Sequence, residues 1–200
     1  AGVQYGFINT PELSLKYSGL AHLADFKVID QQIQEIMQSV VNGMMVLPRR
    51  RLYKMDKGCD YTTIFEPPLG VVRINVMSGR GFEVEKGFLT DDIPDCYCVL
   101  TLGDMTHRTS TVMDNLAPEW NETLDFVLSD NDQILQLQCW DEDEGPLDPD
   151  DDLGTAVTTP GEILLSGQQL ELSLQQDDKP NGAFITVGCE VLKFSSVLKA

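Results

Sequence analysis

The chain has 200 residues, of which 42% are hydrophobic, and a formal net charge of −18 at pH 7. This length and apolar content allow at least one packed core. The charge argues against nucleic acid as a partner, because phosphate binding needs a basic surface, and it repels an anionic membrane unless the acid is neutralised locally. The sequence begins without methionine, and we interpret it as part of a longer protein.

The first 48 residues predict a strand, a turn and a helix. Residues 3–9 (VQYGFIN) have the pattern of an edge strand that ends at Asn9, Thr10 and Pro11. An amphipathic helix follows within residues 26–48. Its apolar stripe consists of residues three and four apart: Ile29, Ile33, Ile36, Met37, Val40 and Met44. One strand and one helix cannot bury this stripe, so we expect its partner surface upstream of Ala1 or on another chain.

Residues 49–68 are polar, basic at their start and end in two prolines, and we interpret them as a linker. Five of the 14 basic residues of the chain lie between Arg49 and Lys57, where they are solvated or touch a membrane surface. The sequence contains no run of 18 apolar residues, so it predicts no membrane-spanning helix.

From Leu69 onward the periodicity changes from helical to alternating. Short alternating runs separated by turn-forming residues occupy eight ranges: 70–77, 96–102, 105–112, 122–128, 133–140, 154–159, 169–174 and 183–192. Eight such runs in about 125 residues predict a mainly β fold, an eight-stranded antiparallel β-sandwich.

Five cysteines are present: Cys59, Cys96, Cys98, Cys139 and Cys189. Their number is odd, and four of them fall inside the alternating runs. This pattern predicts buried, reduced thiols of a cytosolic protein rather than disulfides or a metal site.

The stretch CWDEDEGPLDPDDDLG, residues 139–154, places eight carboxylates in sixteen residues. The connections after the first and fifth strands of a sandwich share one end, so these acids are expected beside those of the first connection. That end would gather Asp91, Asp92, Asp95, Asp141, Asp143, Asp148, Asp150, Asp151 and Asp152. A hard cation removes their repulsion, and Ca2+ suits this set better than Mg2+ because it accepts six to eight oxygens in flexible geometry. Composition alone leaves simple solvation equally open.

An EF-hand does not explain the acidic stretch. The position that requires glycine holds Pro146, the twelfth position is Asp152 rather than glutamate, and helical flanks are missing.

Residues 108–128, with the signature Pro118-x-Trp120-Asn121-Glu122, and the strand followed by Asp-x-Asp at residues 135–154 resemble a C2 domain, the Ca2+-dependent phospholipid-binding sandwich. The resemblance covers residues 69 to about 193, and the runs GVVRINV and GAFITVGCEVL at its two ends are typical of the circular variant of the fold. It implies calcium ligation by Asp141, Asp143 and Asp151 in the third loop and by Asp95 in the first. The earlier first-loop ligand of the family falls on Leu89, so Asp91 or Asp92 is its substitute. The third loop is about two residues longer than is usual.

The same resemblance implies membrane contact at the loop tips. Phe88 and Leu89 in the first loop and Pro146 and Leu147 in the third are the expected apolar contacts with an anionic phospholipid membrane, and packing of these side chains on one another is the alternative. The strand that carries a phosphoinositide site in many C2 domains offers only His107 and Arg108, which argues against such a site.

Residues 1–48 resemble the C-terminal end of the synaptotagmin-like, mitochondrial and lipid-binding domain, which precedes C2 domains in extended synaptotagmins, tricalbins and plant synaptotagmins. The resemblance divides the chain into a lipid-carrier fragment (1–48), a basic linker (49–68) and a C2 domain (69–195). It implies a lipid ligand and homodimerisation through the upstream domain, and a place on the cytosolic face of membranes at contacts between endoplasmic reticulum and plasma membrane.

Two other classes of function remain open at this point. The sandwich could regulate a phospholipase or kinase, or it could bind proteins without calcium. Neither His22 nor His107 accompanies a nucleophile elbow, a metal-binding histidine pair or a phosphate loop, so we predict no catalysis within these residues.

Overall fold

The structure, a computed structural model, describes residues 2–14, 27–56, 58, 67–86, 91–143 and 149–194. The chain divides into two compact units, Ala1–Pro67 and Pro68–Ala200, which are described separately below. Within the described ranges, no helix has the length and hydrophobicity needed to cross a bilayer.

The first unit consists of β1 (Gly2–Tyr5), α1 (Lys27–Met45) and β2 (Arg51–Lys54). The predicted strand and helix are therefore confirmed. β1 and β2 pair antiparallel, with Tyr5 opposite Arg51, so part of the segment that we interpreted as a linker is a strand. All four residues of the short run RLYK are exposed, so its sequence needs no alternation of apolar and polar residues. The run is recognised as a strand only by its pairing with β1.

The apolar stripe of α1 is uncovered in the described residues. Ile33, Ile36, Met37, Val40 and Met44 are all exposed, Ile36 by 63%. After the helix, Val46 and Leu47 are buried, and the Leu47 N–H donates a hydrogen bond to the carbonyl of Phe7 at 2.9 Å. The expectation that this unit cannot bury its own stripe is therefore confirmed for these positions.

The second unit contains the eight predicted strands. They are β3 (Gly70–Arg80), β6 (Cys96–Leu102), β7 (Met105–Arg108), β8 (Glu119–Leu128), β9 (Leu135–Asp141), β10 (Asp151–Thr158), β11 (Gln169–Gln176) and β12 (Lys179–Lys193). A short hairpin of β4 (Glu85–Lys86) and β5 (Asp91–Asp92) and one helix, α2 (Pro160–Leu165), complete it.

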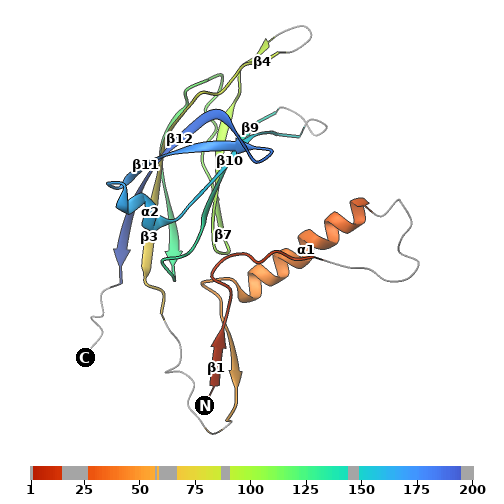
Figure 1. Cartoon of the computed structure of the whole chain (residues 1–200), viewed down its shortest axis with the longest axis vertical. Coiled ribbons are helices and arrows are strands. Elements are labelled where there is room, and N and C mark those ends of the chain that lie inside the picture. Colours follow the sequence, from red (N-terminus) through yellow and green to blue (C-terminus); the bar gives the residue numbers. More distant parts are fainter. Residues whose placement is uncertain are drawn as a thin grey trace. The chain divides into compact units, whose positions relative to one another are not determined.

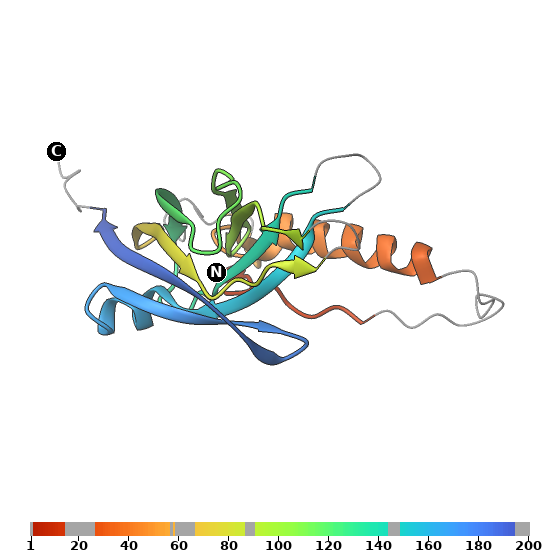
Figure 2. The same ribbon diagram turned by 90° about the horizontal axis from the view of Figure 1, so that it is seen from above.

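All neighbouring strands of this unit are antiparallel, in the order β7-β6-β9-β10-β11-β12-β3-β8. β10 and β11 are paired at a single position, Thr155 opposite Gln175, whereas the other neighbours share longer registers. The sheet therefore divides at this seam into two four-stranded layers, which is the predicted sandwich. The first long strand, β3 (yellow), lies beside the last, β12 (blue), in Figures 1 and 2.

The core of the second unit is formed by inward-facing residues of both layers. Along β3, for example, buried and half-buried positions alternate, as expected for a strand with one face on a core. The largest fully buried side chains include Ile74, Leu100, Phe126, Leu135, Leu137, Leu174 and Ile185. Trp120 of the C2-like signature is also buried, and its indole N–H donates to the carbonyl of Cys96 at 3.2 Å.

Four cysteines, Cys96, Cys98, Cys139 and Cys189, are buried free thiols, as predicted. Burial raises the pKa of Cys96 to about 12 and that of Cys189 to about 11, so both remain protonated at neutral pH. Cys59 lies outside the described residues.

The two units differ completely in charge. Residues 1–67 contain seven basic and seven acidic residues and are neutral, whereas residues 68–200 contain seven basic and 25 acidic residues. The entire net charge of −18 therefore belongs to the sandwich.

Candidate metal site at one end of the sandwich

Three of the predicted ligands lie at neighbouring strand ends. Asp95 immediately precedes β6, Asp141 is the last residue of β9 and Asp151 is the first residue of β10. In the register of these strands, Asp141 stands opposite both Cys96 and Asp151. The ends of β9 and β10 and the β4–β5 hairpin all lie at the upper end of the unit in Figure 1. The strand pattern thus places the backbones of all three aspartates side by side.

Hydrogen bonds join the first and third connections at this end. The Asp95 N–H donates to Asp141 Oδ1 at 2.7 Å, and the Glu142 N–H donates to the Asp95 carbonyl at 3.0 Å. Asp141 is 7% exposed and is the one charged residue that is buried among the described side chains. The expectation that the connections after the first and fifth strands share an end is met by these contacts.

The side chains at this end are held by N–H donors rather than gathered around one point. Asp95 Oδ1 accepts from the Asp114 N–H at 2.6 Å, and Asp141 Oδ1 from Asp95. Among the described side chains, no group of three or more histidine, cysteine or acidic residues is arranged to hold a metal ion. The carboxylate oxygens and their placement on three adjacent strand ends nevertheless fit a hard cation such as Ca2+, for which these are the preferred donors.

The other predicted site residues are only partly described. Asp143 follows β9, and its N–H donates to Asp150 Oδ1 at 3.3 Å. Asp91 and Asp92 form β5, with Asp92 opposite Glu85, but their side chains are not described. The four expected membrane contacts, Phe88, Leu89, Pro146 and Leu147, and also Asp148 lie outside the described residues.

A polar network that sequence reasoning missed borders the third connection. The Tyr97 hydroxyl on β6 donates to Asp150 Oδ2 at 2.5 Å. Burial and this hydrogen bond raise the pKa of Tyr97 to about 12, and the same bond lowers the pKa of Asp150. Asp150 thus remains a charged acceptor next to Asp151.

Arg108 on β7 and Glu142, the residue after β9, extend this network. The Arg108 guanidinium lies over the Tyr97 ring, 3.6 Å from its centroid, and its Nη2 is 2.7 Å from Glu142 Oε1. Hydrogen bonds from Thr111 and Arg108 lower the pKa of Glu142. From the sequence, we considered Arg108 only as a candidate contact for a phosphoinositide. One signal in the sequence could have revealed the role of Tyr97. Because side chains alternate along a strand, Tyr97 points to the outer face, away from the face of Cys96 and Cys98.

All arginines of the second unit are described, and each forms an ion pair. Arg73 binds Asp125 at 2.8 Å, Arg80 binds Glu171 at 2.7 Å and Arg108 binds Glu142. The guanidinium groups are therefore committed to carboxylates of the same unit. This unit offers an anionic surface little positive charge of its own.

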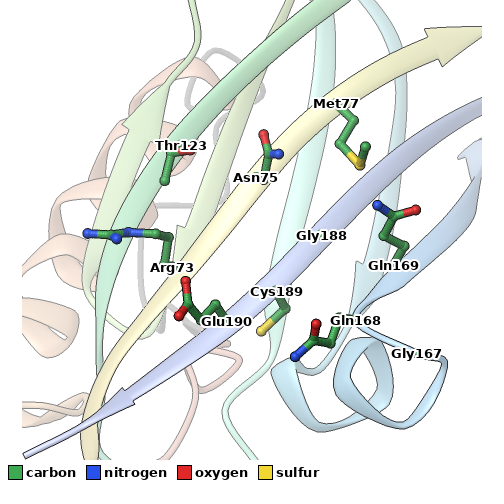
Figure 3. A pocket seen from close by; sticks show the side chains of 10 residues that line it. All are labelled: Arg73, Asn75, Met77, Thr123, Gly167, Gln168, Gln169, Gly188, Cys189 and Glu190. Atoms are coloured by element: carbon green, nitrogen blue, oxygen red, sulfur yellow. The ribbon is translucent and has the colours of Figure 1, made fainter.

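We compare two concavities of the second unit, one at the loop end and one on the surface of the sheet. A groove of about 620 Å³ runs beside Asp151 and is lined by residues 81–84, 151–153, Gln176, Asn181 and Ala183. A smaller cavity of about 300 Å³ lies on β3 and β12, where Figure 3 shows Met77 beside Gln169. The smaller cavity brings together amides, one arginine that is already bound to Asp125 and a single carboxylate, Glu190, so it lacks the convergent carboxylates of the loop end.

Residues 70–176, more than half of the chain, match the family model described as "C2 domain". The chain belongs to the C2 domain family. The match covers most of the strands of the second unit, and the family is one that binds membranes and lipids.

Several known proteins resemble this C2 chain. Mouse extended synaptotagmin-3 is 29% identical over 161 residues, which are 79% of this chain and 18% of the relative. The calcium-bound pair of C2 domains of extended synaptotagmin 2 aligns with 64% of this chain and 48% of its own length, at 24% identity and a TM-score of 0.52. A structure of the SMP domain and both C2 domains of extended synaptotagmin 2 aligns with 96% of this chain and 42% of its own length, at 23% identity and a TM-score of 0.53. The structural matches show the fold, and the chain spans less than a fifth of the curated relatives it matches.

Proposed function

We propose that this C2 domain binds anionic phospholipid membranes in a Ca2+-dependent manner. The observation that carries the proposal is the register of β6, β9 and β10, which sets Asp95, Asp141 and Asp151 at one end of a unit with a charge of −18. The calcium-bound state of the similar C2 domains of extended synaptotagmin 2 supports it.

The ligands that we propose are Asp95, Asp141, Asp143 and Asp151, together with Asp91 or Asp92. Their oxygens are the donors that Ca2+ prefers, and close carboxylates otherwise repel each other by about 1 kcal/mol or more per pair. Bound Ca2+ would supply positive charge and coordination positions that lipid phosphate can fill. Without it, the carboxylates repel anionic lipid, and the ion-paired arginines offer little compensation.

The loop tips provide the second part of the proposed interaction. Phe88 and Leu89 in the first connection and Pro146 and Leu147 in the third would enter the headgroup region, where burying a large apolar side chain is worth about 1.5–3 kcal/mol. The groove beside Asp151 offers space for a headgroup next to the proposed ligands.

For the whole protein, we propose membrane tethering and lipid transport at contacts between endoplasmic reticulum and plasma membrane. The first unit would be the end of a lipid-carrier domain that binds lipid and homodimerises. Its uncovered α1 stripe supports this, because such a surface needs a partner, and so does the alignment of 96% of the chain with a structure that contains SMP and C2 domains.

Sedimentation with liposomes tests the proposal. The chain should sediment with phosphatidylserine liposomes at micromolar to sub-millimolar Ca2+ and remain in solution with a chelator or with phosphatidylcholine alone. Replacing Asp143 and Asp151 by asparagine should abolish this binding. The matched control carries Asp130→Asn and Asp132→Asn, which change the net charge equally in the turn after β8, and it should bind like the wild type. Equal binding with and without Ca2+, or none in either condition, would show that the mechanism is wrong.

A further inference from the structure

We propose that Tyr97 is a positioning residue for the calcium site: through Asp150 it holds the two ends of the connection between β9 and β10 in place before the ion binds. This inference rests on the proposed function and adds to it a residue outside the ligand set.

The geometry gives Asp150 a bridging role. Its Oδ2 accepts the Tyr97 hydroxyl at 2.5 Å, and its Oδ1 accepts the N–H of Asp143 at 3.3 Å. Asp143 lies two residues after the end of β9, and Asp150 lies one residue before the start of β10. One carboxylate therefore links the outgoing end of the connection, the returning end and strand β6. Because one oxygen accepts the Tyr97 hydroxyl and the other accepts the Asp143 N–H, Asp150 connects β6 to the backbone of one proposed ligand, Asp143, and directly precedes another, Asp151.

Tyr97 is itself rigidly held. It is 7% exposed and stands opposite Trp140 in the register of β6 and β9. Arg108 covers its ring and is fixed in turn by its ion pair with Glu142, the residue between the proposed ligands Asp141 and Asp143. Because the ring is held in this way, its hydroxyl oxygen is already positioned beside Asp150, and little further conformational entropy is lost when it donates its hydrogen bond. Ligands held in this way bind more tightly, because less conformational entropy is lost on binding.

The decisive variant is Tyr97→Phe, which keeps the ring under Arg108 and removes only the hydroxyl. We expect calorimetric titration to show that the Ca2+ dissociation constant rises about three- to tenfold, the range for loss of a typical intramolecular hydrogen bond. Tyr53→Phe, on the exposed strand β2, is the matched control and should leave the affinity unchanged.

A double-mutant cycle separates positioning from a general loss of structure. Asp150→Ala should weaken Ca2+ binding, and the double variant with Tyr97→Phe should be no weaker than Asp150→Ala alone, because both changes break the same contact. Asp150→Asn keeps an oxygen acceptor and should recover part of the affinity. Circular dichroism with a chelator checks that each variant is folded.

The outcomes distinguish this inference from the function on which it rests. If the wild type binds Ca2+ and Tyr97→Phe binds within twofold of it, or if the effects of Tyr97→Phe and Asp150→Ala add, the positioning role is wrong and the proposed function stands. If the wild-type chain does not bind Ca2+, both proposals are overturned.

Discussion

The two units of this chain use their apolar and charged residues in opposite ways. The first unit is neutral and leaves the stripe on α1 exposed, whereas the C2 unit encloses its apolar residues between two layers and carries the whole charge of −18. Each unit therefore presents a different kind of unmatched surface, apolar in the first unit and negatively charged in the second. Among its described residues, the first unit has no surface that covers the exposed stripe of its helix, and the C2 unit has too few basic residues to balance the carboxylates of its loop end.

The difference between the units predicts a large contrast between two matched substitutions. Leu137→Ala, in the fully buried core of β9, should lower the free energy of unfolding of the C2 unit by about 2–5 kcal/mol. Ile36→Ala on the exposed stripe of α1 should change the stability of the first unit by about 0.5 kcal/mol or less. Urea unfolding, followed by tryptophan fluorescence for the C2 unit and by helical circular dichroism for the first unit, measures both. A large loss from Ile36→Ala would show that the stripe is covered.

A smaller effect concerns the buried thiols of the C2 unit at alkaline pH. Burial, followed by the charge of Asp141, raises the pKa of Cys96 from 9.0 to about 12. Between these values the folded state holds a proton that the unfolded state has released, so this contribution to stability is complete below pH 9 and is lost as pH rises toward 12. The loss is at most about 1.4 kcal/mol per pH unit for one thiol.

Urea unfolding under reducing conditions at about pH 8.5, 9.25 and 10, on either side of the unfolded-state value, measures this slope. Cys96→Ala should show a shallower decline with pH than the wild type, whatever its stability at the lowest pH. Identical slopes would mean that the Cys96 thiol titrates alike in the folded and unfolded states.

The sandwich could be predicted from the sequence because alternation is a local signal with a period of two. Leu135, Leu137 and Cys139 alternate with glutamines in a strand that buries one face, and the structure places that strand between β6 and β10 as β9. β2 and the β4–β5 hairpin were not predicted, because four- and two-residue strands with exposed or charged side chains are defined by their partners and not by a pattern of their own.

The candidate site could be predicted in position but not in detail. The strand order follows from the fold, so Asp95 and Asp141 were expected at one end, and the structure joins them by a hydrogen bond. The contact of Tyr97 with Asp150 spans 53 residues and depends on which face of β6 meets the third connection. Such a contact has no local signature, and the choice between Asp91 and Asp92 as a ligand remains a prediction for the same reason.

Calorimetric titration of the whole chain with Ca2+, with and without phosphatidylserine liposomes, tests the central claim most directly. We predict saturable Ca2+ binding that becomes tighter when the liposomes are present, because lipid phosphate completes the coordination and the ion cancels the repulsion between the domain and the membrane. The double variant Asp143→Asn, Asp151→Asn should show no heat of saturable Ca2+ binding. Absence of saturable binding, or an affinity that liposomes leave unchanged, would contradict the account.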